Sequence, residues 1–292
     1  MRGIVLAGGT GSRLWPITKG ISKQLLPIYN KPLIFFPIAT LMMAGIKEIL
    51  IITTPHDLLI FKKCLGDGSE FNVTFEFETQ DQPLGLAQAF IIGEDFIGQE
   101  SVALILGDNI FHGNGAGRSL SRNLNVVGAR IFACTVSNPS DYGVVDLDEV
   151  GKPLKITEKP KSPTSHLAVP GLYFFDHDVV AIAKAVTKSE RGELEITSIL
   201  QHYLENGKLD VELFPRSTSW FDAGTYDSLL EASEYVRIVE KRQGQMIANL
   251  EEISWRNGWI SDEKFIGSTF SSQGEQYSLY KESLIREKKN GL

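Results

Sequence analysis

The sequence is poor in cysteine and has no long apolar run. Its 292 residues include two cysteines, Cys64 and Cys134, whose spacing does not fit a cysteine-ligated metal site. Both lie among apolar residues, so we expect reduced thiols in the core. No stretch reaches the roughly 18 apolar residues of a membrane span, and the apolar run at the N-terminus is too short for a signal peptide. The composition therefore predicts a cytoplasmic protein with no membrane partner.

Basic residues and histidines are also scarce. Lys and Arg total 29 against 36 Asp and Glu, which gives a formal net charge of −7. A general nucleic-acid binder would show a basic patch, so nucleic acid is not expected as a partner. The five histidines are scattered, and no Ser/His/Asp or Cys/His set is evident, so we assign no histidine to catalysis. An acidic protein that binds phosphates must gather its cations locally or use a metal.

What the sequence does contain is an alternation of apolar strands and helical patterns, with shorter strands after residue 142. This rhythm predicts a mostly parallel sheet with helices on both faces. The expected strands are residues 3–7, 48–53, 73–78, 101–106, 130–136, 143–146, 155–157, 171–175 and 211–214. The expected helices are residues 33–44, 58–65, 85–92, 178–185, 195–206 and 226–242.

The end of the chain has a different pattern. Residues 245–292 read as further helices and loops with charged faces, and the chain shows no internal repeat, in particular no hexapeptide β-helix pattern. We therefore expect an α/β protein with a single large domain. This domain would be built on a twisted, Rossmann-like, mostly parallel sheet. The domain would span residues 1–242, and residues 243–292 would form a small helical region.

A loop with three glycines in four positions follows the first strand. Gly8, Gly9 and Gly11 let main-chain N–H groups approach an anion, and successive N–H groups can form a concave site for phosphate oxygens. Arg13 adds a permanent charge, and Lys23 is a second cation ten residues further on. The segment therefore reads as a triphosphate-binding loop.

Two commoner phosphate loops do not fit. A Walker A loop ends in Gly-Lys-Ser/Thr, whereas Gly11 is followed by Ser12 and Arg13, and Leu14 stands where a dinucleotide fingerprint needs its third glycine. The alternative is a glycine-rich turn with no ligand. The spacing of Arg13, Lys23 and the prolines around them favours the phosphate loop.

Two aspartates from distant parts of the chain are candidate metal ligands. Asp108 follows the expected strand 101–106, and Asp222 precedes a glycine in the segment 220–225. Ligands of open α/β sheets bind beyond the carboxyl ends of strands, and Mg²⁺ prefers oxygen ligands and phosphate partners. Either aspartate alone could equally serve in a turn or a helix cap. Together with the glycine loop, the pair favours a shared metal ion.

Lys159 is a candidate anion ligand. It follows an expected strand and precedes Pro160, so its ammonium group could reach a bound phosphate. On its own it would more commonly be a solvated surface lysine.

The loop with its two cations resembles the signature of sugar-1-phosphate nucleotidyltransferases, and the wider chain resembles the short bacterial glucose-1-phosphate thymidylyltransferases. Gln24 favours the branch that uses dTTP, because the UDP-glucose branch usually has Glu after the lysine. The segments that carry the resemblance are residues 6–27, 80–88, 106–109, 142–144, 158–160, 170–173, 192–197 and 220–225.

The resemblance implies a role for individual residues. Leu6, Gly8, Gly9, Gly11, Gln24, Gln80 and Gly85 would bind the nucleotide, with Gln24, Gln80 and Gly85 at the thymine base. Asn109, Gly143, Glu158, Lys159 and Val169 would line the glucosyl phosphate pocket. Arg13, Lys23, Asp108, Lys159 and Asp222 would be catalytic, with Asp108 and Asp222 holding Mg²⁺.

The implied reaction converts dTTP and α-D-glucose 1-phosphate into dTDP-glucose and pyrophosphate, with Mg²⁺ as cofactor. The resemblance also implies a homotetramer that a deoxysugar nucleotide inhibits between subunits. Residues 243–292 would build that interface, with help from His112, Gly113 and Arg216.

Three other functions remain open at this point. A sister enzyme could use UTP or another sugar 1-phosphate. A non-catalytic regulatory relative would be expected to have lost Arg13, Asp108 or Lys159, and all three are present. A glycosyltransferase of similar shape would typically carry Asp-x-Asp after the strand, but residue 110 is isoleucine.

Overall fold

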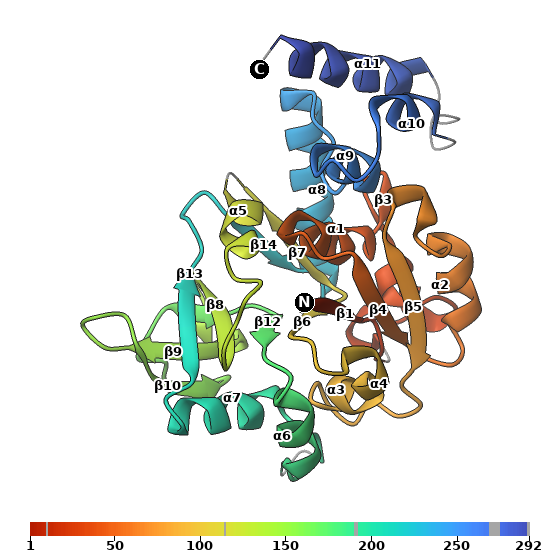
Figure 1. The fold of residues 1–292 in the computed structure, drawn as a ribbon. Coiled ribbons are helices and arrows are strands. Elements are labelled where there is room, and N and C mark those ends of the chain that lie inside the picture. Colours follow the sequence, from red (N-terminus) through yellow and green to blue (C-terminus); the bar gives the residue numbers. More distant parts are fainter. Residues whose placement is uncertain (10, 114, 190–191, 269–274, 291–292) are drawn as a thin grey trace.

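The computed structural model describes residues 1–9, 11–113, 115–189, 192–268 and 275–290 (Figure 1). Thr10, within the glycine-rich loop, lies outside the described residues. A ten-stranded sheet in the order β10-β9-β11-β8-β12-β6-β1-β4-β5, with β13 beside β8, forms the centre of the fold.

One half of this sheet is parallel. Strands β1 (Arg2–Leu6), β4 (Glu48–Thr53), β5 (Thr74–Thr79) and β6 (Val102–Leu106) all run in the same direction. β1, β4 and β6 are almost continuous apolar runs because both of their faces are covered. The alternation of strands and helices in the sequence predicts this half correctly.

The other half of the sheet is mixed. Three strands, β10 (Pro153–Glu158), β11 (Leu167–Val169) and β12 (Leu172–Phe175), run antiparallel to the rest of the sheet. The others are β8 (Ala129–Thr135), β9 (Gly143–Leu147) and β13 (Leu209–Leu213). Most strands of the whole sheet therefore point the same way, as the sequence predicts.

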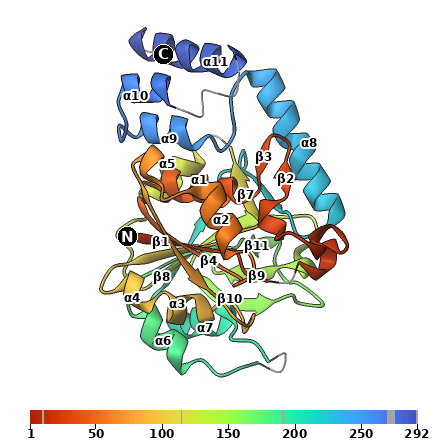
Figure 2. The same ribbon diagram turned by 90° about the vertical axis from the view of Figure 1, so that its right-hand side faces the viewer.

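Helices cover both faces of the sheet. Along β1, Ile4 and Leu6 belong to one buried cluster, while Val5 and Ala7 belong to a second cluster on the opposite face. Figures 1 and 2 both place α3, α4, α6 and α7 on one side and α1, α5 and α9 on the other. The helices on the first side are α3 (Gln88–Ile92), α4 (Glu94–Ile97), α6 (Val179–Ala185) and α7 (Ile196–Glu205). Those packed on the second cluster are α1 (Phe35–Ala44), α2 (Leu58–Leu65), α5 (Ala116–Ser121) and α9 (Leu250–Arg256).

The helix expected at residues 85–92 is wrong at its start. Gly85 has φ of 112°, in the left-handed region, so the helix cannot include it, and α3 begins at Gln88. A Cβ at Gly85 would lie 2.4 Å from the carbonyl oxygen of Leu194. The close approach of these two chain segments therefore requires glycine at this position.

Two small strand pairs were not predicted. β7 (Asn109–His112) pairs antiparallel with β14 (Ser219–Asp222), and β2 (Pro27–Ile28) pairs with β3 (Lys31–Pro32). Each of these strands has four residues or fewer, which is too short for a periodic pattern to appear in the sequence. The described residues also form five short 3-10 helices, at Ser12–Leu14, Ile17–Lys19, Lys23–Leu25, Ser69–Phe71 and Pro139–Asp141.

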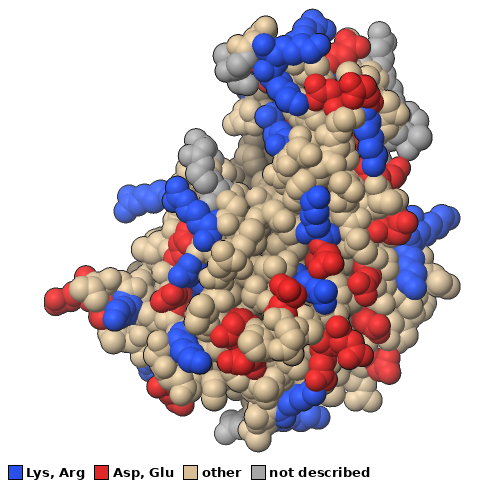
Figure 3. Space-filling view, viewed as in Figure 1, with Lys and Arg blue, Asp and Glu red and all other residues tan. Residues whose placement is uncertain are grey.

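The C-terminal helices gather at one end of the molecule (Figures 1 and 2). α8 (Tyr226–Gln243) begins at a capping box and leads to α9, α10 (Asp262–Gly267) and α11 (Glu275–Lys289). A small core of Trp255, Ile260, Phe265, Leu284 and Ile285 holds the last three helices together. Figure 3 shows this helical part projecting from the body, with acidic and basic side chains interspersed on the visible face. Among the described helices, none is both long and apolar enough to cross a membrane.

Candidate active site

A cavity of about 670 Å³ lies beyond the carboxyl end of β6. This is the position where ligands of open α/β sheets bind. Eight of the candidate residues line it: Arg13, Asp108, Asn109, Gly143, Glu158, Lys159, Val169 and Asp222. The structure thus brings the expected metal ligands and the expected sugar-phosphate residues into one cavity.

The two aspartates come together because β7 pairs with β14. Asp222 lies opposite Asn109 in that pair, and the main-chain N–H of Ala223 donates to the carbonyl oxygen of Asp108 at 3.0 Å. The pKa of Asp222 is raised by burial and by the charge of Asp108, although the N–H of Gly224 and the charge of Arg13 oppose this. Two carboxylates from positions far apart in the sequence therefore face the same cavity and interact electrostatically.

Asp108 is stabilised in its charged form by its neighbours. Burial alone would raise its pKa, but the charge and hydrogen bond of Lys23 and a hydrogen bond from Asn109 hold the pKa below its usual value. The Asn109 side-chain amide donates to Asp108 Oδ1 at 3.0 Å. Asp108 is therefore an ionised carboxylate in a mostly buried position.

Lys23 pairs directly with Asp108. Its Nζ donates to Asp108 Oδ2, and its side chain is 16% exposed. It is not among the residues that line the cavity. In this structure Lys23 therefore forms an ion pair with Asp108 without lining the cavity. Its expected approach to the reacting phosphates stays a prediction.

Arg13 reaches the cavity from the glycine loop. Gly11, with φ of 56°, turns the chain into the 3-10 helix Ser12–Leu14, and its carbonyl oxygen accepts a hydrogen bond from the Thr18 hydroxyl at 2.9 Å. A Cβ at Gly224 would lie 3.4 Å from the Arg13 guanidinium and 2.7 Å from Asp222 Oδ1. The bare backbone at Gly224 thus lets the guanidinium and the carboxylate lie on the same side of the cavity.

The sugar-phosphate candidates form one wall of the cavity. Gly143 pairs with Glu158 across β9 and β10, and with Val169 across β9 and β11. Lys159 has φ of 42° and its main-chain N–H donates to the carbonyl of Tyr142 at 3.1 Å, so the chain turns at this residue. This turn places the exposed Lys159 side chain at the rim of the cavity.

The nucleotide candidates lie beside this cavity, around the end of β1. A Cβ at Gly8 would lie 2.7 Å from Gln80 Oε1, and a Cβ at Gly107 would lie 2.9 Å from Gln24 Cγ and 3.0 Å from the carbonyl of Leu6. The buried side chains of Gln80 and Gln24 therefore approach the backbone at Gly8 and Gly107, because neither glycine has a side chain in the way. The other predicted nucleotide residues, Gly9, Gly11 and Gly85, all have positive φ.

Sequence reasoning assigned no role to Trp220. Its indole N–H donates to Asn109 Oδ1 at 2.7 Å, and the main-chain N–H of Gly171 donates to the same oxygen at 3.0 Å. Its ring also lies 4.8 Å from that of Tyr142. Trp220 thus fixes the amide that holds Asp108. The sequence gives one indication of this role: Trp220 lies two residues before Asp222, so on a strand both side chains point to the same face.

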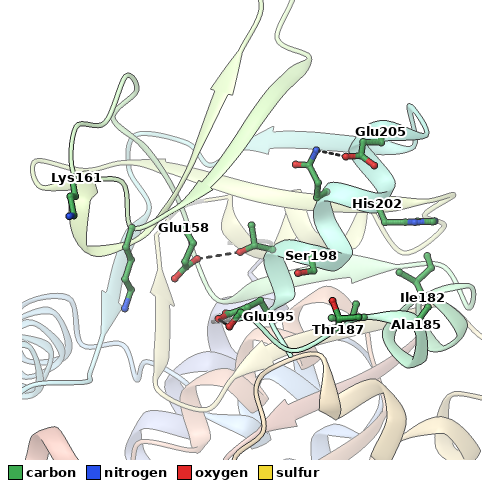
Figure 4. Close-up of a pocket in the computed structure, with 14 residues that line it drawn as sticks. Glu158, Lys161, Ile182, Ala185, Thr187, Glu195, Ser198, His202 and Glu205 are labelled. Atoms are coloured by element: carbon green, nitrogen blue, oxygen red, sulfur yellow. Dashed lines mark hydrogen bonds between the residues drawn. The ribbon is translucent and has the colours of Figure 1, made fainter. Parts of the chain in front are cut away.

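A larger cavity of about 1,100 Å³ lies next to the first (Figure 4). Its lining comes mainly from α7, the end of α6 and the loops that follow α6 and β10, and it includes Lys161, Thr187 and His202. Glu158 stands between the two cavities, where its carboxylate accepts a 3.4 Å hydrogen bond from the Thr197 hydroxyl. Since the larger cavity contains neither aspartate, we assign the chemistry to the smaller one.

Comparisons with known proteins show the family to which the chain belongs. The nucleotidyl transferase family model matches residues 2–238. The glucose-1-phosphate thymidylyltransferase of Mycobacterium tuberculosis is 56% identical over 266 residues, which are 91% of this chain and 92% of that protein. The enzyme of the same name from Neisseria meningitidis is 49% identical and covers 98% of this chain and 100% of its own length.

Two solved structures are also similar to this chain. A Bacillus anthracis protein described as a glucose-1-phosphate thymidylyltransferase, crystallised with sucrose, is 40% identical with a TM-score of 0.75 and covers 81% of this chain and 95% of its own. A UDP-glucose pyrophosphorylase in complex with UDP-glucose is 27% identical with a TM-score of 0.71 and covers 82% of this chain and 99% of its own.

The chain belongs to the nucleotidyl transferase family and is a nucleotidyltransferase enzyme. Within that family it groups with the bacterial glucose-1-phosphate thymidylyltransferases, which confirms the resemblance seen in the sequence.

Proposed function

We propose that this enzyme transfers a thymidylyl group from dTTP to α-D-glucose 1-phosphate, giving dTDP-glucose and pyrophosphate in a Mg²⁺-dependent reaction. The observation that carries the proposal is the pairing of β7 with β14, which sets Asp108 and Asp222 beside Arg13 in one cavity with Lys159 at its rim. The names of relatives that are 47–56% identical support the substrates.

A phosphate oxygen of the sugar phosphate attacks the α-phosphorus of dTTP, and the bond from that phosphorus to the pyrophosphate oxygen breaks. The sugar phosphate is already a nucleophile at neutral pH, because its second pKa is near 6, so no general base is needed. The difficulty is that two anions must meet: unit charges at 4 Å repel by about 4 kcal/mol at an effective dielectric of 20. Arg13 and Lys159 lower that repulsion from two sides of the cavity.

The donor set fits a divalent cation. Asp108 and Asp222 offer carboxylate oxygens, and phosphate oxygens of the substrate would complete the oxygen shell that Mg²⁺ prefers. A divalent cation here would also relieve the repulsion that raises the pKa of Asp222. When bound, it would supply charge neutralisation at the reacting phosphates.

The closest alternative is a sister enzyme that uses UTP or another sugar 1-phosphate. The likeness to a UDP-glucose pyrophosphorylase at 27% identity keeps this alternative open, while the higher identity of the thymidylyltransferases favours dTTP. A pyrophosphate-release assay separates them. Four nucleoside triphosphates are crossed with the 1-phosphates of glucose, galactose, mannose and N-acetylglucosamine, with and without Mg²⁺. We expect the dTTP and glucose pair to give the highest rate, and a clear maximum elsewhere would reject the proposal.

We also propose that residues 1–242 form the catalytic domain and residues 243–292 the interface and regulatory region of a cytoplasmic homotetramer. All the candidate catalytic and substrate-binding residues lie before residue 243, and α9–α11 have their own small core. A cavity of about 590 Å³ between α1, β7 and α9 is lined by His112 and Gly113, which supports a feedback site for a deoxysugar nucleotide there. Arg216, expected at the same site, is not among its lining residues.

A further inference from the structure

Gln80 and Gln88 form a hydrogen-bonded pair next to the glycine loop. The Gln80 Nε2 donates to Gln88 Oε1 at 2.7 Å. An amide group has a donating and an accepting end of nearly equal shape, so its orientation is decided by its partners. Here the partners are main-chain groups whose polarity cannot change.

Both ends of the pair are anchored in this way. The main-chain N–H of Leu84, which can only donate, lies 3.3 Å from Gln88 Oε1. That end of Gln88 must therefore be its carbonyl oxygen, and the atom of Gln80 that faces it must be the amide nitrogen. The carbonyl of Gly85, which can only accept, lies 3.4 Å from the same Gln80 nitrogen and agrees with this orientation.

The remaining end of the Gln80 amide is its Oε1, which lies against Gly8. A Cβ at Gly8 would come within 2.7 Å of this oxygen, so only the bare backbone of the loop permits its position. Within the part of the chain that the structure describes, no donor is hydrogen-bonded to Gln80 Oε1. A buried glutamine thus presents an acceptor at the proposed nucleotide site.

We propose that Gln88 is a positioning residue that sets nucleobase specificity by holding Gln80 with its carbonyl toward the base. The proposal rests on the proposed function, in which Gln80 faces thymine. Thymine and uracil carry an N–H at position 3, which can donate to this carbonyl. Cytosine has a bare acceptor nitrogen at that position, and two facing acceptors leave both groups unpaired.

The energetic consequence depends on how firmly the amide is held. Turning the Gln80 amide over would bring its oxygen toward Gln88 Oε1 and the Gly85 carbonyl, and three acceptors would face one another. An unsatisfied buried polar group typically costs enough to change an equilibrium by a factor of ~10 to ~100. Gln88 therefore excludes the orientation that would accept cytosine.

The test measures kcat/KM for dTTP and for dCTP, and KM for glucose 1-phosphate, in the full-length protein. Gln88→Met removes the acceptor at similar length, and we expect the ratio of dTTP to dCTP to fall on the order of tenfold while KM for glucose 1-phosphate stays unchanged. Gln88→Glu keeps an acceptor toward both Leu84 and Gln80, so its ratio should stay near the wild-type value. Gln82→Met, at an exposed position six residues earlier, is the matched control and should have no effect.

Several outcomes would overturn the inference. An unchanged nucleotide ratio in Gln88→Met, or an equal loss for both nucleotides together with a raised KM for the sugar phosphate, would show a structural role only. The Glu variant tests the inference even if the Met variant does not fold, since a loss of selectivity in it contradicts the polarity described above. A wild-type enzyme that is inactive with dTTP would reject the proposed function itself, whereas an active wild type with an unaffected Met variant would reject the role of Gln88 alone.

Discussion

At the scale of single residues, Asp108 is the most constrained group of the site. It is buried, ionised and held by Lys23 and Asn109 on one side, while the cavity lies on the other. Asp108→Asn keeps the shape of the side chain and removes the charge that a divalent cation needs. We expect kcat to fall on the order of 10²-fold or more, as for the loss of one transition-state electrostatic contact.

Steady-state kinetics at saturating Mg²⁺ check this expectation. Asp95→Asn, an exposed aspartate on α4, is the matched control and should leave kcat unchanged. Near-normal turnover in the Asp108 variant would refute the metal assignment.

Lys159 gives a second prediction at this scale. Its position at the rim, on the wall formed by Gly143 and Glu158, supports the proposal that it binds the sugar phosphate. Lys159→Ala should therefore raise KM for glucose 1-phosphate far more than KM for dTTP, while Lys161→Ala, outside the smaller cavity, should change neither. Equal effects of the Lys159 change on both constants would place this lysine in another subsite.

The sequence indicated the residue types of the candidate site, but it did not indicate their hydrogen-bond and ion-pair partners. Glycines after a strand, Arg13 and the two aspartates point to phosphate and metal because few other groups serve that chemistry. The pairing of Lys23 with Asp108 could not be predicted from the sequence, since it joins residues 85 positions apart. Trp220 and Gln88 act through other side chains, and such roles leave no local pattern.

At the scale of elements, long apolar strands and amphipathic helices were predicted well. α2 and β4 have the expected bounds, because their burial gives a clear pattern with a glycine or a polar residue at the ends. β7 and β14 were missed, yet they are the elements that join the two aspartates. Short strands of this kind depend on partners far away in the sequence rather than on local propensity.

The start of α8 offers a test at this scale. The Thr225 hydroxyl accepts from the main-chain N–H of Ser228 at 3.2 Å, and Ser228 Oγ accepts in turn from the N–H of Thr225 at 3.0 Å. Thr225→Ala should lower the free energy of unfolding by about 1 kcal/mol, the usual value of an N-cap. Thr225→Ser retains a hydroxyl and should recover most of the stability in a denaturant titration. An Ala variant as stable as wild type would mean that tertiary packing alone fixes the start of this helix.

At the scale of the whole molecule, the two halves of the sheet supply different parts of the candidate site. The parallel half ends at the glycine loop and Asp108, and the other half supplies the wall with Gly143 and Glu158. The sequence predicted the first half from its alternation, whereas the order of the short strands in the second half comes from pairings across the chain. The site lies where the two halves meet, beyond β6.

The C-terminal helices lead to a prediction about the oligomeric state. If residues 243–292 build an interface, sedimentation equilibrium of the full chain should give a mass of four chains. A monomer would leave no site between subunits for an effector, and the cavity at His112 would then need another explanation.

The shared metal site is tested most directly by the rate of pyrophosphate release from dTTP and glucose 1-phosphate as Mg²⁺ is titrated, in wild type and in Asp222→Asn. We expect no measurable release without a divalent cation, saturable activation in wild type, and a much higher Mg²⁺ requirement in the variant. Equal rates with and without the cation, or identical titration curves for the two proteins, would contradict the claim that Asp108 and Asp222 together hold a catalytic metal ion.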